Sequence, residues 1–423
     1  MPTIAFADTA FARLSKTVAR SLGAPALPIA VVPTPIEGRT VEENRTSAES
    51  VIDDVIYALT NPPQGSSEGE KGTDEIITIE GNNYAEAVEK MNELFMDKKW
   101  GDGLPLIPPT EEAVDRMLKG TSHSPDEVVG VLEQRKGIAT VKIVAINAVM
   151  AGCKPEYLPV VLAAVEAVTN PEYNLYGVQA TTAPAVPLLA INGPIRKELD
   201  INCSSGCMGP GYPANATIGR AFNLVMTAVG GRSTTTMTSV GDPGRFTWCF
   251  GENEEELPAD WLPLHMDKGY KPEESTVTVM NVHWKGPIHG FFAPTTDDEA
   301  IEHVSEIIKY ELPNWSGEKL LVLLPEIAAQ LSRKAATKKE LREILFANAR
   351  LPWKELKESQ SVKIGSFPPD EIEGLNDDTM LSPILPEPDY MNIIVTGGAG
   401  RHSYLVIPWI KTRTITALID KWR

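Results

Sequence analysis

Two cysteines four positions apart stand in a loop rich in glycine, proline and serine, within residues 202–220. The loop precedes a predicted helix, for which Asn215 is the expected N-cap. A helix start presents unpaired N–H groups and a partial positive charge, and glycines let main-chain amides approach a ligand closely. Because such surroundings stabilise a thiolate, we expect Cys207 to be a catalytic nucleophile or a redox thiol. The alternative is a small buried hydrophobic side chain, which is the usual state of a free cysteine.

The other cysteines do not suggest a metal centre. Cys203 is a candidate resolving thiol, although a C-x₃-C spacing is weak evidence for one. Cys153 and Cys249 are isolated in the sequence, whereas zinc and iron–sulfur sites use closely spaced cysteines. We therefore expect no cysteine-based metal site, and the sequence identifies no cofactor. His283 and His289 flank a turn and are a possible ligand pair, although most single histidines are structural.

Proton transfer has two candidates. Glu252 follows an aromatic-rich run that should be buried, and a carboxylate held near a pocket can act as a general acid or base. His265 is the second candidate, and its alternative role is that of a metal ligand or a structural group. For Glu252 the alternative is a solvated acidic turn, which is the state we expect of Glu255 and Glu256.

Polar residues near the ends of predicted strands and in loops form a predicted substrate site. The loop after the strand at 392–395 contains successive glycines, whose amides together with a cationic side chain can hold an anion. Its glycine spacing differs from a dinucleotide fingerprint, and a tight β-turn is the alternative. Clustered donors also orient small ligands elsewhere, unless they only cap and tie loops. The predicted substrate-binding residues are Asp102, Gln179, Thr181, Thr182, Asn192, Arg220, Asn253, Gly398, Arg401 and His402.

Hydrophobic periodicity predicts the elements that must position these residues. Strands alternate with helices, which indicates a layered α/β fold. Residues 1–61 read as a small α/β half-domain, packed on a larger mixed α/β domain over residues 76–423 that carries the cysteine loop. Residues 62–75 have the composition of a linker.

Within the half-domain, helices are expected over residues 5–22 and 42–59, with a strand at 27–32. In the larger domain, nearly apolar helices at 140–150 and 155–165 should be buried, and a strand is expected at 186–191.

Composition and net charge also indicate which partners and which cellular compartment to expect. The 423 residues carry a formal net charge of −18, which argues against nucleic acid as a partner because phosphate binding needs clustered Lys and Arg. No apolar run reaches the roughly 20 residues that cross a bilayer, so we expect no membrane partner. Four cysteines do not form a disulfide scaffold, and we expect a cytoplasmic protein.

Two portions of the chain resemble a known family. Much of residues 76–410 resembles the C-terminal region of the UGSC family, which is named for a selenocysteine-Gly-Ser-Cys motif in its N-terminal domain. Residues 3–59 resemble the second half of that N-terminal domain. It is in turn similar to part of the selenoprotein B subunits of glycine and betaine reductases, which cleave a carbon–heteroatom bond through a selenol or thiol. The segments that carry the resemblance include Trp100-Gly-Asp-Gly-Leu-Pro, Gly177-Val-Gln-Ala-Thr-Thr, Ile191-Asn-Gly-Pro-Ile-Arg, Gly251-Glu-Asn-Glu-Glu, Gly397-Gly-Ala-Gly-Arg-His-Ser and, in the half-domain, Leu27-Pro-Ile-Ala-Val-Val-Pro.

The chain also departs from the family. The selenocysteine-Gly-Ser-Cys motif is missing from the sequence. Pro33-Thr34-Pro35 stands where the resemblance implies Pro-His-Pro. The resemblance therefore implies that the chain begins downstream of the first half of the domain, at a misread selenocysteine codon for example, or that this member lost that chemistry.

These observations lead to two functional expectations. The first is a thiol-dependent enzyme, of lyase, reductase or hydrolase type, acting on a carbon–heteroatom bond of a small polar or anionic molecule. The alternative is a non-catalytic or partial-site binding subunit, completed by a partner chain that carries the missing motif. We expect a homo-oligomer in the first case and a heteromer in the second.

Overall fold

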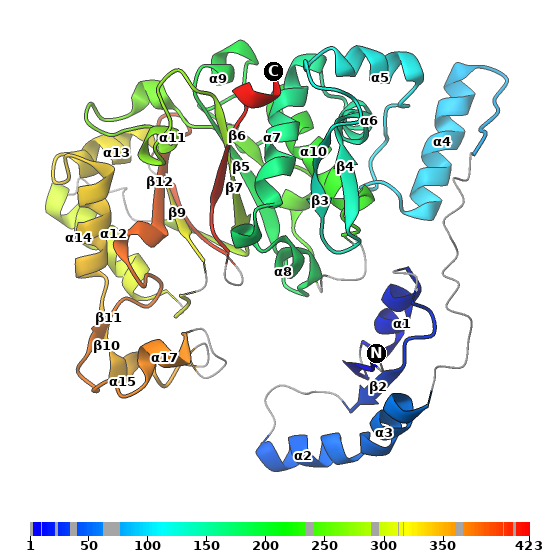
Figure 1. Cartoon of the computed structure of the whole chain (residues 1–423). Coiled ribbons are helices and arrows are strands. Elements are labelled where there is room, and N and C mark those ends of the chain that lie inside the picture. Colours follow the sequence, from blue (N-terminus) through cyan, green and yellow to red (C-terminus); the bar gives the residue numbers. More distant parts are fainter. Residues whose placement is uncertain are drawn as a thin grey trace. The chain divides into compact units, whose positions relative to one another are not determined.

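The structure of the chain is a computed structural model with two compact units, residues 1–80 and 81–423 (Figure 1). The predicted linker over residues 62–75 lies outside the described part of the chain. The class is α/β, as predicted. The described residues are 3–9, 11–21, 24–33, 40–61, 77–232, 238, 240–288, 296–311, 313–315, 317–359, 362, 367–400, 402–408 and 412–423.

The N-terminal unit is built on a parallel strand pair, β1 (Ala5–Asp8) and β2 (Ile29–Val32), connected through α1 (Ala12–Ser21). The prediction of one helix over residues 5–22 is wrong at its start. Residues 5–8 are extended because their main chain pairs with β2, a contact that local periodicity does not reveal.

Two further helices complete this unit, α2 (Val41–Glu49) and α3 (Ile52–Thr60). A capping box between Thr40 and Glu43 begins α2, since each side chain accepts a main-chain N–H of the other. The single helix predicted over 42–59 is therefore two helices.

The larger unit contains two four-stranded mixed sheets. The first has the strand order β14-β7-β5-β6 and the second the order β12-β9-β13-β8. Only His283 separates β7 from β8, so the chain passes from one sheet directly into the other. The strands are β5 (Val186–Asn192), β6 (Cys249–Gly251), β7 (Thr276–Val282), β8 (Trp284–Ile288), β9 (Lys319–Leu323), β12 (Met391–Val395), β13 (Ser403–Ile407) and β14 (Ile415–Leu418).

The two sheets pack face to face. Side chains alternate between the two faces of a strand, so Leu188 of β5 and Val322 of β9 meet in the core between the sheets. Leu321 and Leu323 of β9 face outward, into a second core beneath helices. The strands are consequently apolar on both faces, which explains why their sequences are continuous hydrophobic runs.

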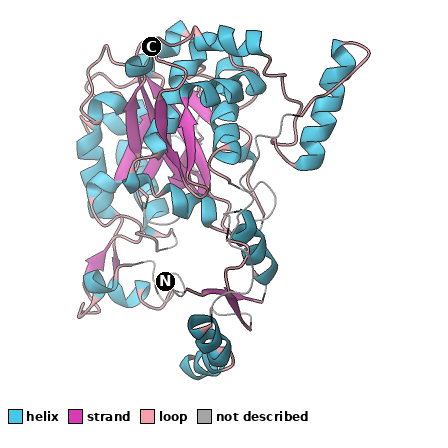
Figure 2. Ribbon diagram, turned by 45° about the vertical axis from the view of Figure 1, so that its right-hand side comes forward, coloured by secondary structure: helices cyan, strands magenta, loops and turns pink. Residues whose placement is uncertain are grey.

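Helices cover both outer faces, which makes four layers (Figure 2). The first sheet is covered by α7 and α10, with α6 packed against them, and the second by α12, α13 and α14. As predicted, the apolar helices near residues 140–150 and 155–165 are buried. The helix bounds are α6 (Val141–Ala151), α7 (Leu158–Val168), α10 (Pro213–Ala228), α12 (Asp297–Lys309), α13 (Pro325–Ser332) and α14 (Lys338–Asn348).

Smaller elements surround these layers. No helix among the described residues is long and apolar enough to span a membrane. The remaining helices and strands are α4 (Tyr84–Lys98), α5 (Glu111–Leu118), β3 (Val128–Leu132), β4 (Gly137–Thr140), α8 (Leu175–Ala180), α9 (Ile195–Glu198), α11 (Leu264–Asp267), β10 (Leu351–Pro352), α15 (Trp353–Leu356), α17 (Pro369–Ile372) and β11 (Met380–Leu381).

Candidate functional site

The cysteine loop and the glycine loop after β12 lie against each other, although almost 200 residues separate them in the sequence. The Thr396 hydroxyl is 3.0 Å from the Cys203 carbonyl oxygen, and the Gly397 amide donates to that same oxygen at 2.9 Å. The Cys207 sulfur lies 3.3 Å from the Thr396 hydroxyl. Two segments that the sequence identified separately therefore form one site.

Asn215 fixes the shape of the cysteine loop. Its side chain accepts from the Asn202 amide at 2.8 Å and donates to the carbonyl oxygens of Asn202 (2.9 Å) and Cys207 (3.1 Å). The prediction that Asn215 caps the following helix is wrong, because α10 begins at Pro213 with Tyr212 as its N-cap. Proline at the first helical position already fixes φ there, and the asparagine amide instead ties the loop together.

A cavity of about 390 Å³ opens beside Cys207. Trp248, Val322 and Tyr404 contribute to its apolar wall, and Thr247 and Thr396 supply hydroxyl groups. A pocket of this size and character fits a small organic molecule. Cys207 therefore lines a cavity and is at the same time part of the apolar core between the two sheets.

The pKa of the Cys207 thiol is shifted upward, opposite to the direction expected from the sequence. The residue is only 5% exposed, and burial raises the pKa of its thiol, opposed by the Thr396 hydroxyl and by main-chain amides of Gly397 and Met208. We expected the helix start to lower this pKa. Because α10 begins six residues later, at Pro213, desolvation is the larger effect. The resting form of Cys207 is the neutral thiol.

Thr396 can change its role when the thiol loses its proton. Its single hydroxyl proton has two carbonyl acceptors, Gly251 at 2.7 Å and Cys203 at 3.0 Å. While the proton points to a carbonyl, the hydroxyl oxygen can accept a hydrogen bond from the S–H group of Cys207. Rotation of the hydroxyl lets it donate to a thiolate instead, which stabilises the charged form.

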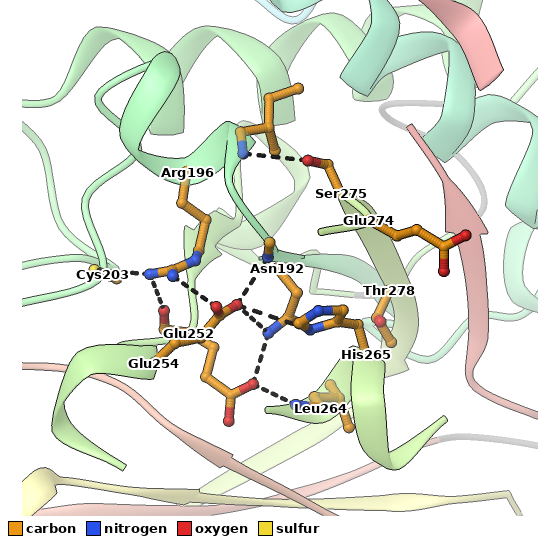
Figure 3. A network of polar contacts seen from close by, with 12 residues as sticks. Asn192, Arg196, Cys203, Glu252, Glu254, Leu264, His265, Glu274, Ser275 and Thr278 are labelled. Atoms are coloured by element: carbon orange, nitrogen blue, oxygen red, sulfur yellow. Dashed lines mark hydrogen bonds and ion pairs between the residues drawn. The ribbon is translucent and has the colours of Figure 1, made fainter. Parts of the chain in front are cut away.

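Glu252 lies at the centre of a buried polar network, part of which is drawn in Figure 3. Its fully buried carboxylate accepts from the Asn192 side chain at 2.7 Å, the Leu264 amide at 2.6 Å and the Val395 amide at 3.2 Å. The Lys338 ammonium lies 2.8 Å away. Glu252 thus connects β5, α11, β12 and α14, and it is not among the residues that line the Cys207 cavity.

Arg196 is the second centre of this network, and the sequence analysis missed it. It is 3% exposed and contacts Glu254 at 2.8 Å and both carboxylate oxygens of Glu255 at 3.2 Å. Burial lowers the pKa of Arg196, but the two carboxylates reverse this, and the net shift is upward. Glu255 is exposed, as expected, and it also pairs with Arg196 and Lys197, which the sequence does not predict.

Figure 3 also shows His265 beside this network. Its Nδ1 is 3.8 Å from Glu254 Oε1, and the side chain is buried. Burial lowers the pKa of His265, so the ring is neutral near pH 7. Like Glu252, it is not among the residues lining the Cys207 cavity.

Several predicted substrate-binding residues serve other contacts. Arg220 and Asp102 bind each other through two bonds, of 2.6 and 3.0 Å, away from the lining of the Cys207 cavity. The Gln179 side chain is buried and donates to the sulfur of Met226 at 3.7 Å. Thr181 accepts a main-chain N–H, that of Ala183, whereas Thr182 is exposed and Arg401 lies outside the described residues.

Three others lie at or near the joined loops. Asn253 donates from its side chain to the Gly397 carbonyl at 3.3 Å, and its amide donates to the Val395 carbonyl at 2.7 Å. Asn192 bonds Glu252 and Glu254, as described for the polar network. Gly398 packs against Ser205 of the cysteine loop.

Among the residues described, no three His, Cys, Asp or Glu side chains gather as a potential metal site. His283 is half-buried, and burial lowers its pKa, while His289 lies outside the described residues.

Replacing Gly398 with alanine should separate the two loops. A Cβ at this position would lie 1.8 Å from the Ser205 Oγ and 3.1 Å from its Cα, so one loop must move. We expect Gly398→Ala to change the reactivity of Cys207 toward iodoacetamide several-fold, because the Thr396 and Gly397 groups shift with the loop. Mass-mapped alkylation rates measure the effect. Adding Ser205→Gly should restore much of the native rate, and an unchanged rate in the single variant would contradict this packing.

Residues 1–61 match the model of the UGSC family. No curated protein and no solved structure matches the chain. The match thus lies within the N-terminal unit and leaves out the loops that carry the candidate site.

Proposed function

We propose that this chain is a thiol-dependent enzyme that acts on a carbon–heteroatom bond of a small polar or anionic substrate, with Cys207 as the nucleophile. The observation that carries the proposal is that Cys207 lines a cavity of about 390 Å³, with the hydroxyl of Thr396, another lining residue, 3.3 Å from its sulfur. The UGSC match of the N-terminal unit is a second support, and the resemblance of that segment to selenoprotein B subunits favours the same bond type.

The proposed step needs no group that the chain lacks. The Cys207 sulfur attacks the carbon that bears the heteroatom, a carbon–sulfur bond forms, and the carbon–heteroatom bond breaks. The heteroatom leaves with the electron pair of the broken bond and takes up one proton. This proton matches the one that the Cys207 thiol loses, so the step is balanced. Thr396 and the amides of Gly397 and Met208 favour the thiolate while the proton is in transit.

Proton transfer is better assigned to His402 than to Glu252 or His265. No histidine, aspartate, glutamate or lysine is among the described residues that line the cavity. Tyr404 and Val406 of β13 do line it, and side chains two residues apart share a strand face. His402 directly precedes β13, two residues before Tyr404, and is exposed, so it is the histidine that stands nearest in sequence to this lining strand and can exchange protons with solvent.

The fate of the covalent adduct distinguishes the reaction types. Hydrolysis or elimination releases Cys207 without an external reductant. A reductive route needs a second thiol to attack the Cys207 sulfur, and the Cys203 sulfur instead lies 3.8 Å from the Arg196 guanidinium, outside the cavity lining. This geometry favours a lyase or a hydrolase.

Alkylation across a pH range tests whether Cys207 is accessible and reactive. Since its pKa is raised, the iodoacetamide rate at Cys207 should still be increasing above the ordinary thiol pKa of about 8.5. Cys153 and Cys249 should react far more slowly, because burial raises the pKa of both much further, to about 12 for Cys153. Peptide mapping by mass spectrometry measures all four rates. A Cys207 that stays unlabelled in the folded protein at high pH would remove it from the mechanism.

One observation favours the alternative of a binding subunit. The core of the N-terminal unit comprises Ala30, Val32 and Val51, while larger apolar side chains such as Phe6 and Tyr57 are exposed within that unit. A partner chain that covers them would complete the unit. Native mass spectrometry distinguishes the two candidates, because an active product of this chain alone excludes an obligate heteromer.

A further inference from the structure

A second cavity, of about 410 Å³, lies next to the Cys207 cavity. Pro243 lines both cavities, so the turn at residues 243–245 separates them. The wall of the second cavity contains two arginines, Arg232 and Arg245, together with the polar residues Asn223 and Thr227. Neither arginine has a place in the proposed reaction at Cys207.

Arg232 is buried, and the described part of the chain supplies no carboxylate partner for it. It is 5% exposed, and one of its terminal nitrogens donates to the Asn223 carbonyl at 3.3 Å. Its Nε has no acceptor, and within the described ranges no carboxylate lies at ion-pair distance from it. Charged groups removed from water in this way are normally paired.

Arg196 provides an internal comparison. It is as deeply buried as Arg232, but two carboxylates pair with it and raise its pKa. For Arg232 the shift has the opposite sign: burial and the neighbouring charge of Arg245 lower the pKa to about 9. The second cavity is therefore lined by an arginine, Arg232, whose charge no described carboxylate neutralises.

The carboxylates of the same wall are already engaged. Asp102 holds Arg220 through two bonds, and Asp242 accepts the Gly244 amide at 2.7 Å and attracts Arg245. On the acceptor side, Asn223 Oδ1 is buried and lacks a donor. Among the described residues, the wall thus offers the unpaired Nε donor of Arg232 and the unpaired amide oxygen of Asn223.

We infer that this cavity binds the oxyanion group, carboxylate or phosphate, of a small molecule, with the Arg232 guanidinium as its main partner. A planar guanidinium matches either oxyanion in a two-bond geometry, and a hydroxyl of the same ligand fits Asn223 Oδ1. The inference does not depend on turnover at Cys207. Its failure is therefore distinguishable from a failure of the proposed enzyme activity.

Direct binding to the full chain tests the inference. Isothermal titration calorimetry with inorganic phosphate and with glycolate should show binding, and Arg232→Gln should weaken it by about tenfold to a hundredfold, the loss typical of a charge-assisted pair. Arg333→Gln is the matched control, since Arg333 is an exposed arginine paired with Asp297 and should leave the affinity unchanged. Absence of binding at millimolar concentrations of both probes, or equal affinities in the two variants, would overturn the inference.

A second variant separates binding from folding. Arg232→Met keeps an apolar stem of similar length and removes the charge. If Arg232 serves a ligand, the variant should unfold at an equal or higher temperature than the native chain, and phosphate should no longer raise that temperature. If Arg232 serves only the fold, Arg232→Met should lower the unfolding temperature and leave any phosphate effect in place, which would refute the site.

Discussion

Replacing Cys207 with serine is expected to reduce turnover by about a thousandfold or more, the scale seen when a catalytic nucleophile is removed. A serine hydroxyl keeps the hydrogen bond to Thr396, and its size fits the same place in the wall. Its far higher pKa leaves almost no anion to attack the substrate. Steady-state rates and covalent adducts on the intact protein, detected by mass spectrometry, measure the loss.

Cys203→Ser is the matched control for this prediction. Cys203 lies in the same loop, but its sulfur lies near Arg196 and is not part of the cavity wall. A lyase or hydrolase should keep most of its rate in this variant, whereas a reductase with a resolving thiol should lose it. Thermal unfolding of both variants checks that folding is intact. Native activity in Cys207→Ser would exclude the proposed mechanism.

The second large effect concerns stability. Lys338→Met should lower the free energy of unfolding by about 3–5 kcal/mol, because it leaves the fully buried Glu252 carboxylate without its cation. The three remaining donors to Glu252 are neutral groups, so they do not replace the charge. Urea unfolding monitored by tryptophan fluorescence measures the change.

The neighbouring residue offers a control in the same helix. Lys339 has a side chain that is 74% exposed, and its ammonium is 4.0 Å from Glu343. Lys339→Met should change the free energy of unfolding by less than about 1 kcal/mol. A similar loss in both variants would mean that helix α14, rather than the buried ion pair, accounts for the effect.

The sequence predicts which segments belong to the candidate site but not how these segments contact each other. The cysteine loop and the loop at 396–400 were recognisable because glycine, proline and reactive side chains gather there. Their contact depends on the parallel pairing of β12 with β9 and on the packing of two sheets. Pairing between distant strands leaves no mark in local periodicity.

The polar network was the least predictable part. The sequence predicts Glu252 as a general acid or base held near a pocket, but its partner Lys338 is 86 residues away and lies in an ordinary helical pattern. Arg196 was missed for a similar reason: a single arginine after a strand gives no local sign of burial. The nearby excess of acids at residues 252–256 was the available signal, because buried carboxylates need a cation.

The passage of the chain from β7 into β8 through His283 alone has a mechanical consequence. A single-residue joint keeps the end of β7 and the start of β8 close together, so the two four-stranded layers cannot separate at this edge. The His283 amide, which donates to the Ile407 carbonyl at 2.9 Å, fastens that joint further. We therefore expect ligands to enter and leave by movement of the loops at the rim rather than by separation of the two layers at this joint.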